Sequence, residues 1–251
     1  MAQQSGIIKL KGTLGGISFY KTSDGYLARE KGGVSAQRIA TDPAFQRTRE
    51  NNAEFSTAGK AGKLVRNSIQ VLLQTARDKR CVARLTRSLL AVVKTDEVNA
   101  RGERKVQDGN MQLINGFEFN QNGKLGSTFF TPFVSALDRT TGELSVDIDA
   151  YQAAVRIAAP RGTTHYRLNF AGVELDFEER NFNFSMEQTA ILPHTSVEQV
   201  ASSLTATLTA NTTLPVLGVL GIEFFQEVNA EMYPLKNGAF NALAVIKIDQ
   251  V

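Results

Sequence analysis

The chain has no tryptophan, one cysteine and two histidines among its 251 residues. The single Cys81 excludes an internal disulfide framework and a cysteine-based zinc site, and its place on an apolar helical face predicts a buried, unreactive thiol. His165 and His194 are far apart in the sequence and have no carboxylate at ligand spacing, so we expect surface or structural histidines. The sequence therefore predicts neither a metal site nor a cofactor.

Long apolar runs are also missing. The chain contains no stretch of about eighteen apolar residues and no apolar run behind a basic N-terminal head, so we expect neither a membrane span nor a signal peptide. This favours synthesis in the cytoplasm. Later release, or assembly into an extracellular or virion-like particle, stays open.

The common catalytic signatures are absent as well. The sequence has no G-x-S-x-G elbow, no dinucleotide fingerprint and no H-E-x-x-H motif. Residues 57–64 briefly resemble a phosphate loop, but Thr57 stands where that motif requires glycine and Leu64 where it requires serine or threonine. We therefore expect no catalytic residue and predict that the protein is not an enzyme.

What the sequence does contain is a charge asymmetry between its two halves. Residues 1–108 carry 20 Lys and Arg against 10 Asp and Glu, whereas residues 109–251 carry 8 against 15, so the net charges are +10 and −7. A subunit that is positive at one end and negative at the other has a complementary partner in a second copy of itself.

The N-terminal part predicts strands and then helices. Strand patterns occupy 7–10, 17–21 and 26–30, and Thr22-Ser23-Asp24-Gly25 joins the last two as a hairpin turn within the segment 6–31. Asp42 and Pro43 then supply a helix cap and a first helical residue. Apolar stripes follow and predict two helices, or one bent helix, over about 43–95.

The C-terminal part predicts a sandwich of antiparallel strands. Polar turn signals over 109–127 indicate a linker, and apolar and polar residues alternate beyond it, as in Leu144, Val146 and Ile148. We thus predict an α+β fold in which a basic region, 1–108, with a β-hairpin and helices precedes an acidic antiparallel β-sandwich, 128–251, of immunoglobulin-like size.

Three groups of side chains are candidates for interfaces. Apolar and aromatic residues of the hairpin would fill pockets on a neighbour. Four arginines spaced for one helical face could bind phosphates or carboxylates, and a comb of carboxylates on one strand could accept them, although a solvated helix face and a solvated sheet face explain both sets too. The three groups are Ile17, Phe19, Tyr20 and Tyr26; Arg77, Arg80, Arg84 and Arg87; and Glu174, Asp176 and Glu178.

Several glycine-rich and aromatic segments resemble a family of uncharacterised proteins widespread in Bacteroidota. The resemblance rests on segments near both ends: GIIKLKGTLGGISFYK (6–21), DGYLAREKGG (24–33), TREN (48–51), GIEFFQEVN (221–229) and YPLKNGAFNA (233–242). It implies a host group and transfers no activity and no site residue.

These observations favour a structural subunit that assembles with copies of itself into a filament, tube, sheath or other particle. In this hypothesis the hairpin adds to an exposed sheet edge of a neighbour, and the basic half meets the acidic half of the next copy, head to tail. The first alternative is a nucleic-acid-associated protein that uses the four arginines. A second is a carbohydrate-binding module, which the absence of tryptophan disfavours.

Overall fold

The computed structural model describes residues 2–30 and 32–251, and the chain divides into two compact units, residues 1–49 and 50–251. The division therefore falls near the start of a long helix. It does not fall at the linker that the sequence predicts.

No helix in the described ranges is long and apolar enough to cross a membrane.

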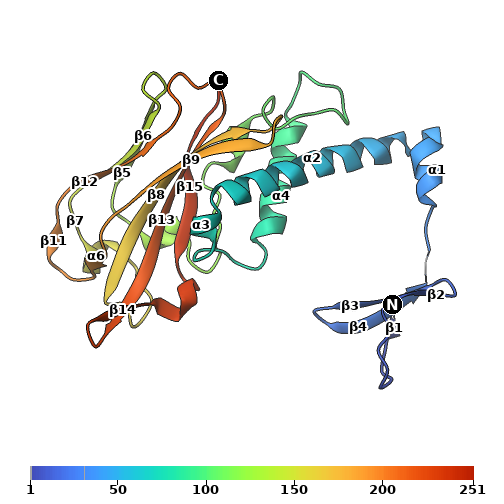
Figure 1. Cartoon of the computed structure of the whole chain (residues 1–251), viewed down its shortest axis with the longest axis horizontal. Helices are drawn as coiled ribbons and strands as arrows, with labels where there is room; N and C mark the ends of the chain where they lie inside the picture. The colour runs from blue at the N-terminus through green and yellow to red at the C-terminus, as the bar shows by residue number, and fades with distance from the viewer. Residues whose placement is uncertain (1, 31) are drawn as a thin grey trace. The chain divides into compact units, whose positions relative to one another are not determined.

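The first unit is a small antiparallel sheet followed by helical turns (Figure 1). Its strand order is β1-β4-β3-β2, with β1 Ala2–Gln3, β2 Gly12–Leu14, β3 Ile17–Thr22 and β4 Gly25–Glu30. The predicted hairpin is confirmed, because β3 and β4 pair from Ile17↔Glu30 to Thr22↔Gly25.

The predicted strand at 7–10 is wrong. That segment lies in the connection between β1 and β2. The side chain of Gln4 braces it, since its Oε1 accepts a hydrogen bond from the Leu10 amide at 2.8 Å and its Nε2 donates to the Leu10 carbonyl at 3.3 Å. A side chain here satisfies backbone groups that a ladder would otherwise satisfy.

The helical start predicted at Asp42 and Pro43 is confirmed, and a short helix that the sequence does not predict precedes it. Ser35 caps α1 (Ala36–Thr41), and Asp42 caps the turn η1 (Pro43–Phe45) that leads into α2 (Gln46–Ser68). The hydrogen bond from the Ala44 amide, together with the Arg38 side chain, lowers the pKa of the Asp42 carboxyl. In the second unit, α2 continues into α3 (Gln70–Leu73), and α4 (Cys81–Lys94) follows after a loop.

The second unit is built on a six-stranded antiparallel sheet with the long strands β8 (His165–Asp176) and β13 (Val216–Val228) at its centre. Strands β9 (Asn181–Gln188) and β10 (Leu192–Pro193) pair with β8, and β14 (Glu231–Pro234) and β15 (Ala242–Asp249) pair with β13. A three-stranded sheet has the order β12-β6-β5, with β12 Ser202–Thr207, β6 Glu143–Ile148 and β5 Phe133–Asp138. The remaining elements are short: η2 Met111–Ile114, α5 Leu125–Thr128, β7 Tyr151–Gln152, α6 Ala153–Arg156, β11 Glu198–Gln199 and η3 Leu235–Gly238.

Both faces of the six-stranded sheet are covered (Figure 1). Along β8, Ala171, Val173 and Leu175 pack in one cluster with the side chains of α2, α3 and α4, while Leu168 and Phe170 pack in a second cluster with the three-stranded sheet. The α+β class with a sandwich-like region is thus confirmed. The helices belong to the same unit as the sandwich and cover its other side, because the apolar residues on that side of the sheet need a cover.

The predicted linker at 109–127 is wrong. Met111, Ile114 and Phe119 are buried in the cluster between the helices and the sheet, and the Phe119 amide donates to the Leu243 carbonyl at 2.8 Å. The predicted basic domain 1–108 and acidic domain 128–251 are therefore not separate units. Turn residues marked the segment as irregular, which is correct, but its sparse apolar side chains anchor it in the core.

Candidate interaction surfaces

The predicted hairpin residues Ile17, Phe19 and Tyr26 share one face of the N-terminal sheet, because antiparallel partners project to the same side. We call the apolar part of this side the apolar sheet face; it consists of Leu14, Ile17, Phe19, Tyr26 and Ala28. Two charged residues border it on the same side, Lys21 over the Tyr26 ring and Glu30 opposite Ile17. Tyr20 projects to the opposite side and stacks with Arg29, whose guanidinium carbon lies 5.5 Å from the ring centre.

The apolar sheet face has no core beneath it. None of the described residues in 2–30 and 32–49 is buried, and Leu14 and Ile17 are 70% and 41% exposed. A two-stranded hairpin alone is marginally stable in water, and three or more strands with a hydrophobic face are needed for independent stability. Contiguous exposed apolar patches mark contact sites. The exposed apolar residues of this face are therefore a candidate contact surface.

The sheet edges are less available than the hairpin pattern predicts. Strand β1 pairs with β4 at Ala28 and Leu27, and β2 pairs with β3 from Phe19 to Ile17. Edge strands of two and three residues are a common way to limit edge-to-edge pairing. The face of this sheet is thus a better docking surface than its edges.

The four arginines do not lie on one helical face. Arg77 and Arg80 belong to the connection between α3 and α4, and only Arg84 and Arg87 lie on α4. The helix begins late because the Asp78 carboxylate accepts a hydrogen bond from the Arg80 amide at 2.6 Å.

Arg84 is a structural residue. It forms an ion pair with Asp78 and donates to the carbonyls of Glu118 and Phe119 at 2.6 and 3.2 Å. Burial alone would raise the pKa of Asp78, but hydrogen bonds from the amides of Gln121 and Arg80 and from Arg84 outweigh it and lower that pKa. This cluster fixes the segment around residue 119 against α4, so Arg84 is not free to bind a partner.

The remaining basic side chains near α4 line two hollows beside the α3–α4 connection and residues 116–124. Arg77, Lys79 and Arg80 border one of about 670 Å³, and Arg87 and Lys124 border another of about 400 Å³. We call Arg77, Lys79, Arg80 and Arg87 the basic surface. All four are exposed, and none forms an ion pair with a carboxylate in the described ranges.

The predicted acidic comb is wrong as an exposed acceptor surface. Glu174 is 2% exposed, and its carboxylate accepts hydrogen bonds from the amide and hydroxyl of Thr209 at 2.6 and 2.8 Å. Asp176 caps the β8–β9 turn by accepting from the amides of Glu178 and Glu179. The alternation along β8 predicts one solvent-exposed face, but the three-stranded sheet packs over the face on which Glu174 lies.

A second set of carboxylates, which the sequence reasoning did not select, does form an acidic surface. Asp138 lies opposite Glu143 across β5 and β6, and Asp147 follows on the same face of the three-stranded sheet. We call these three exposed residues the acidic face. Their outward neighbours in the sheet are small or uncharged, for example Ala136, and like charges directly opposite are unfavourable. The alternation of polar and apolar residues along 143–149 predicts that Glu143 and Asp147 are exposed on one face. That Asp138 lies opposite Glu143 depends on the register between β5 and β6, which the sequence does not give.

The basic surface and the acidic face lie on opposite sides of the six-stranded sheet. The basic surface lies on α4 and on the connection that precedes it, and the helices α2 to α4 pack on one side of this sheet, whereas the three-stranded sheet packs on the other. Because both belong to one compact unit, the unit itself is polar across its thickness. Copies stacked in one direction would bring unlike charges together.

No constellation for catalysis or metal binding comes together in residues 2–30 and 32–251. No three His, Cys, Asp or Glu side chains there could hold a metal ion. Burial raises the pKa of the Cys81 thiol, as expected for an inert cysteine. His165 lies 3.8 Å from Glu227, and His194 contacts the Ile157 carbonyl at 3.3 Å, so the two histidines serve separate local contacts.

No family model, curated protein or solved structure matches the chain. The resemblance to Bacteroidota proteins therefore stays a prediction.

Proposed function

We propose that the protein is a structural subunit that associates with copies of itself into a filament, tube or other particle. The observation that carries the proposal is the apolar sheet face, which is exposed on a unit that has no buried described residue. We favour a second copy of the chain as the partner that covers the apolar sheet face, because this face would then be buried in every subunit of the assembly.

The magnitudes favour more than one contact for each subunit. Burying Leu14, Ile17 and Phe19 would contribute roughly 1.5–3 kcal/mol each, whereas association costs about 4–15 kcal/mol in lost freedom. The apolar sheet face alone thus supports a weak contact. The basic surface and the acidic face supply the second contact, and a head-to-tail arrangement propagates unless it closes into a ring.

Addition of the N-terminal strands to a neighbouring sheet edge has weaker support. The edges of β3 and β4 are partly occupied by β1 and β2, so main-chain pairing with a neighbour offers fewer free groups. We therefore place the main contact at the apolar sheet face.

Replacing Phe19 by aspartate is expected to convert the assembled protein to monomers. A carboxylate at the centre of a buried apolar contact is costly, whereas Phe19 is not buried in the subunit itself, so the fold survives. Multi-angle light scattering and negative-stain electron microscopy measure the outcome.

The matched control is Ser18→Asp, which places the same charge one residue away on the opposite face of β3. It is expected to leave the assembly intact. A Phe19→Asp protein that assembles like the wild type, or a wild type that is monomeric at every concentration, would contradict the proposal.

Charge exchange tests the second contact. Arg80→Glu and Asp147→Lys are each expected to weaken assembly at low salt, because each places like charges in contact. The double variant exchanges the two charges and is expected to recover assembly, at least in part. Light scattering across a salt series measures all three, and equal weakening in the double variant would remove this contact from the proposal.

Binding to nucleic acid is the second candidate, favoured by the unpaired cations that border the hollows near α4. Phosphate contacts predict an affinity that falls steeply with salt. If Arg80→Glu leaves assembly unchanged but weakens binding to a DNA duplex at low salt, this second function is the better one.

A further inference from the structure

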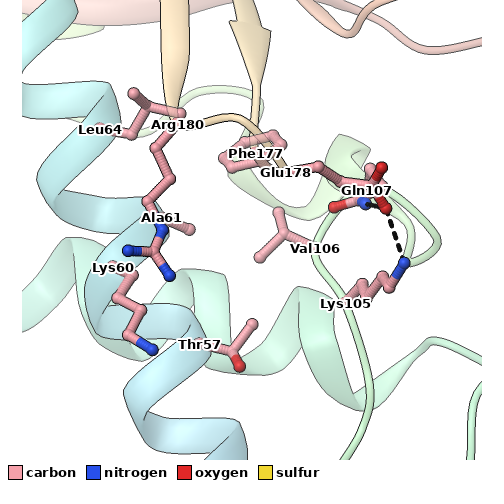
Figure 2. Close-up of a pocket in the computed structure, with 10 residues that line it drawn as sticks. All are labelled: Thr57, Lys60, Ala61, Leu64, Lys105, Val106, Gln107, Phe177, Glu178 and Arg180. Atoms are coloured by element: carbon pink, nitrogen blue, oxygen red, sulfur yellow. Dashed lines mark hydrogen bonds and ion pairs between the residues drawn. The ribbon is translucent and has the colours of Figure 1, made fainter.

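A pocket beside α2 contains none of the residues in the proposed contacts between subunits. It lies between the middle of α2, residues 105–107 and the turn between β8 and β9, and its volume is about 190 Å³. Figure 2 shows Lys60 and Arg180 along the α2 wall, with Val106 and Phe177 facing them. All its lining residues belong to the second unit.

One wall of the pocket carries two unpaired cations. Lys60 comes from α2 and Arg180 from the β8–β9 turn, and neither forms an ion pair or a hydrogen bond with a described residue. Figure 2 shows the guanidinium of Arg180 reaching down this wall toward Lys60. Two like charges on one wall, without a carboxylate between them, attract an anion.

The backbone at Arg180 supports a role for its side chain. Its φ is 56°, in the left-handed region that residues other than glycine rarely adopt. Glycine would occupy this position in the turn without steric cost. The turn instead carries an arginine, whose planar guanidinium is suited to carboxylates and phosphates.

Apart from the Thr57 hydroxyl, the rest of the lining is apolar or consists of polar side chains that bind one another. Val106 is buried at its floor, with Phe177 partly buried beside it. The carboxylate of Glu178 on the far side accepts hydrogen bonds from Lys105 Nζ at 2.6 Å and from Gln107 Nε2 at 3.0 Å. The one acid in the lining is therefore engaged by its own neighbours and does not neutralise Lys60 or Arg180.

From this geometry we infer that the pocket binds a small organic anion, whose carboxylate or phosphate lies against Lys60 and Arg180 and whose apolar body lies on Val106 and Phe177. The volume fits such a ligand, because a water molecule occupies about 30 Å³ and the pocket has space for several. The incomplete phosphate-loop motif at 57–64 contributes Thr57 and Lys60 to the lining, but from within a helix and not from a loop around a phosphate.

Ligand binding to the full-length protein tests the inference. The probes are phenyl phosphate and benzoate, with inorganic phosphate and benzylamine for comparison, measured by saturation-transfer NMR and calorimetry. At least one of the two aromatic anions is expected to bind, and the one that binds identifies the head group. Arg180→Gly is expected to weaken binding about tenfold or more, and Lys60→Gln by a similar factor, because each removes a charge-assisted contact.

The control variant is Lys63→Gln, which removes an exposed lysine of the same helix that does not line the pocket; its affinity should stay within about twofold of the wild type. Arg180→Gly should melt at the wild-type temperature or above, because glycine adopts a positive φ freely, so a loss of binding is not a loss of fold. The inference is overturned if neither aromatic anion binds, if both pocket variants bind like the wild type, if inorganic phosphate binds as tightly as phenyl phosphate, or if benzylamine is the preferred ligand.

Discussion

Replacing Phe119 by alanine is expected to lower the free energy of unfolding by about 3–5 kcal/mol, the usual range for removal of a fully buried phenylalanine. The ring is completely buried between the helices and the six-stranded sheet and packs edge-on against Phe117 at 5.1 Å. Urea denaturation followed by circular dichroism measures the change.

The matched control is Phe130→Ala, which truncates a phenylalanine that is 48% exposed in a nearby loop. Its effect is expected to be below about 1.5 kcal/mol. Equal effects of the two substitutions would mean that residues 109–127 connect two domains without anchoring either. That result would restore the linker that the sequence predicts.

Replacing Asp96 by asparagine is expected to destabilise the protein at neutral pH by about 2–4 kcal/mol, because a buried carboxylate loses its charge-assisted hydrogen bonds. Asp96 is completely buried. It accepts hydrogen bonds at 2.8–3.0 Å from the amides of Val98, Asn99 and Lys105 and from the Asn99 side chain. It thus organises the turn that follows α4.

The pH dependence gives this prediction a second readout. Burial alone would raise the pKa of Asp96, but the four hydrogen bonds outweigh it and lower the pKa from 3.8 to about 2. A carboxyl whose pKa is lower in the folded state stabilises the fold above its unfolded pKa and loses this contribution as the pH falls through the folded value. The difference in stability between wild type and Asp96→Asn should therefore be constant above about pH 5 and shrink between pH 5 and 2.

Asp149→Asn is the control for the pH series, because the Asp149 side chain is exposed and makes no hydrogen bond to a described residue. Its stability curve should follow that of the wild type. If the difference between wild type and Asp96→Asn does not change with pH, the hydrogen bonds of Asp96 do not depend on its charge.

Local signals predicted local structure well. The Thr22–Gly25 turn and the flanking strand patterns predict the β3–β4 hairpin, the Asp42-Pro43 cap predicts the helical start, and the alternation of Leu144, Val146 and Ile148 predicts β6. Each of these depends on neighbours within a few residues of one another, so the sequence itself contains the necessary information.

The interaction surfaces were less predictable, because side-chain exposure depends on what packs against a strand or helix. Arg84 and Glu174 both fit the pattern of exposed charged faces, yet one holds backbone carbonyls near residue 119 and the other is hydrogen bonded to Thr209 beneath the three-stranded sheet. The acidic face required the register that places Asp138 opposite Glu143. The pocket required a turn far along the chain to bring Arg180 beside Lys60.

The sequence by itself thus determined the α+β class, the hairpin and its apolar side, and the lack of familiar catalytic motifs. Only the tertiary structure decided that the helices and the sandwich form one unit, that residues 109–127 belong to its core, and which charges remain free at the surface. The physical reason is that alternation within a strand predicts one buried face. Whether the other face is buried too depends on segments distant in sequence, and in this protein the helices cover one side of β8 and the three-stranded sheet covers the other.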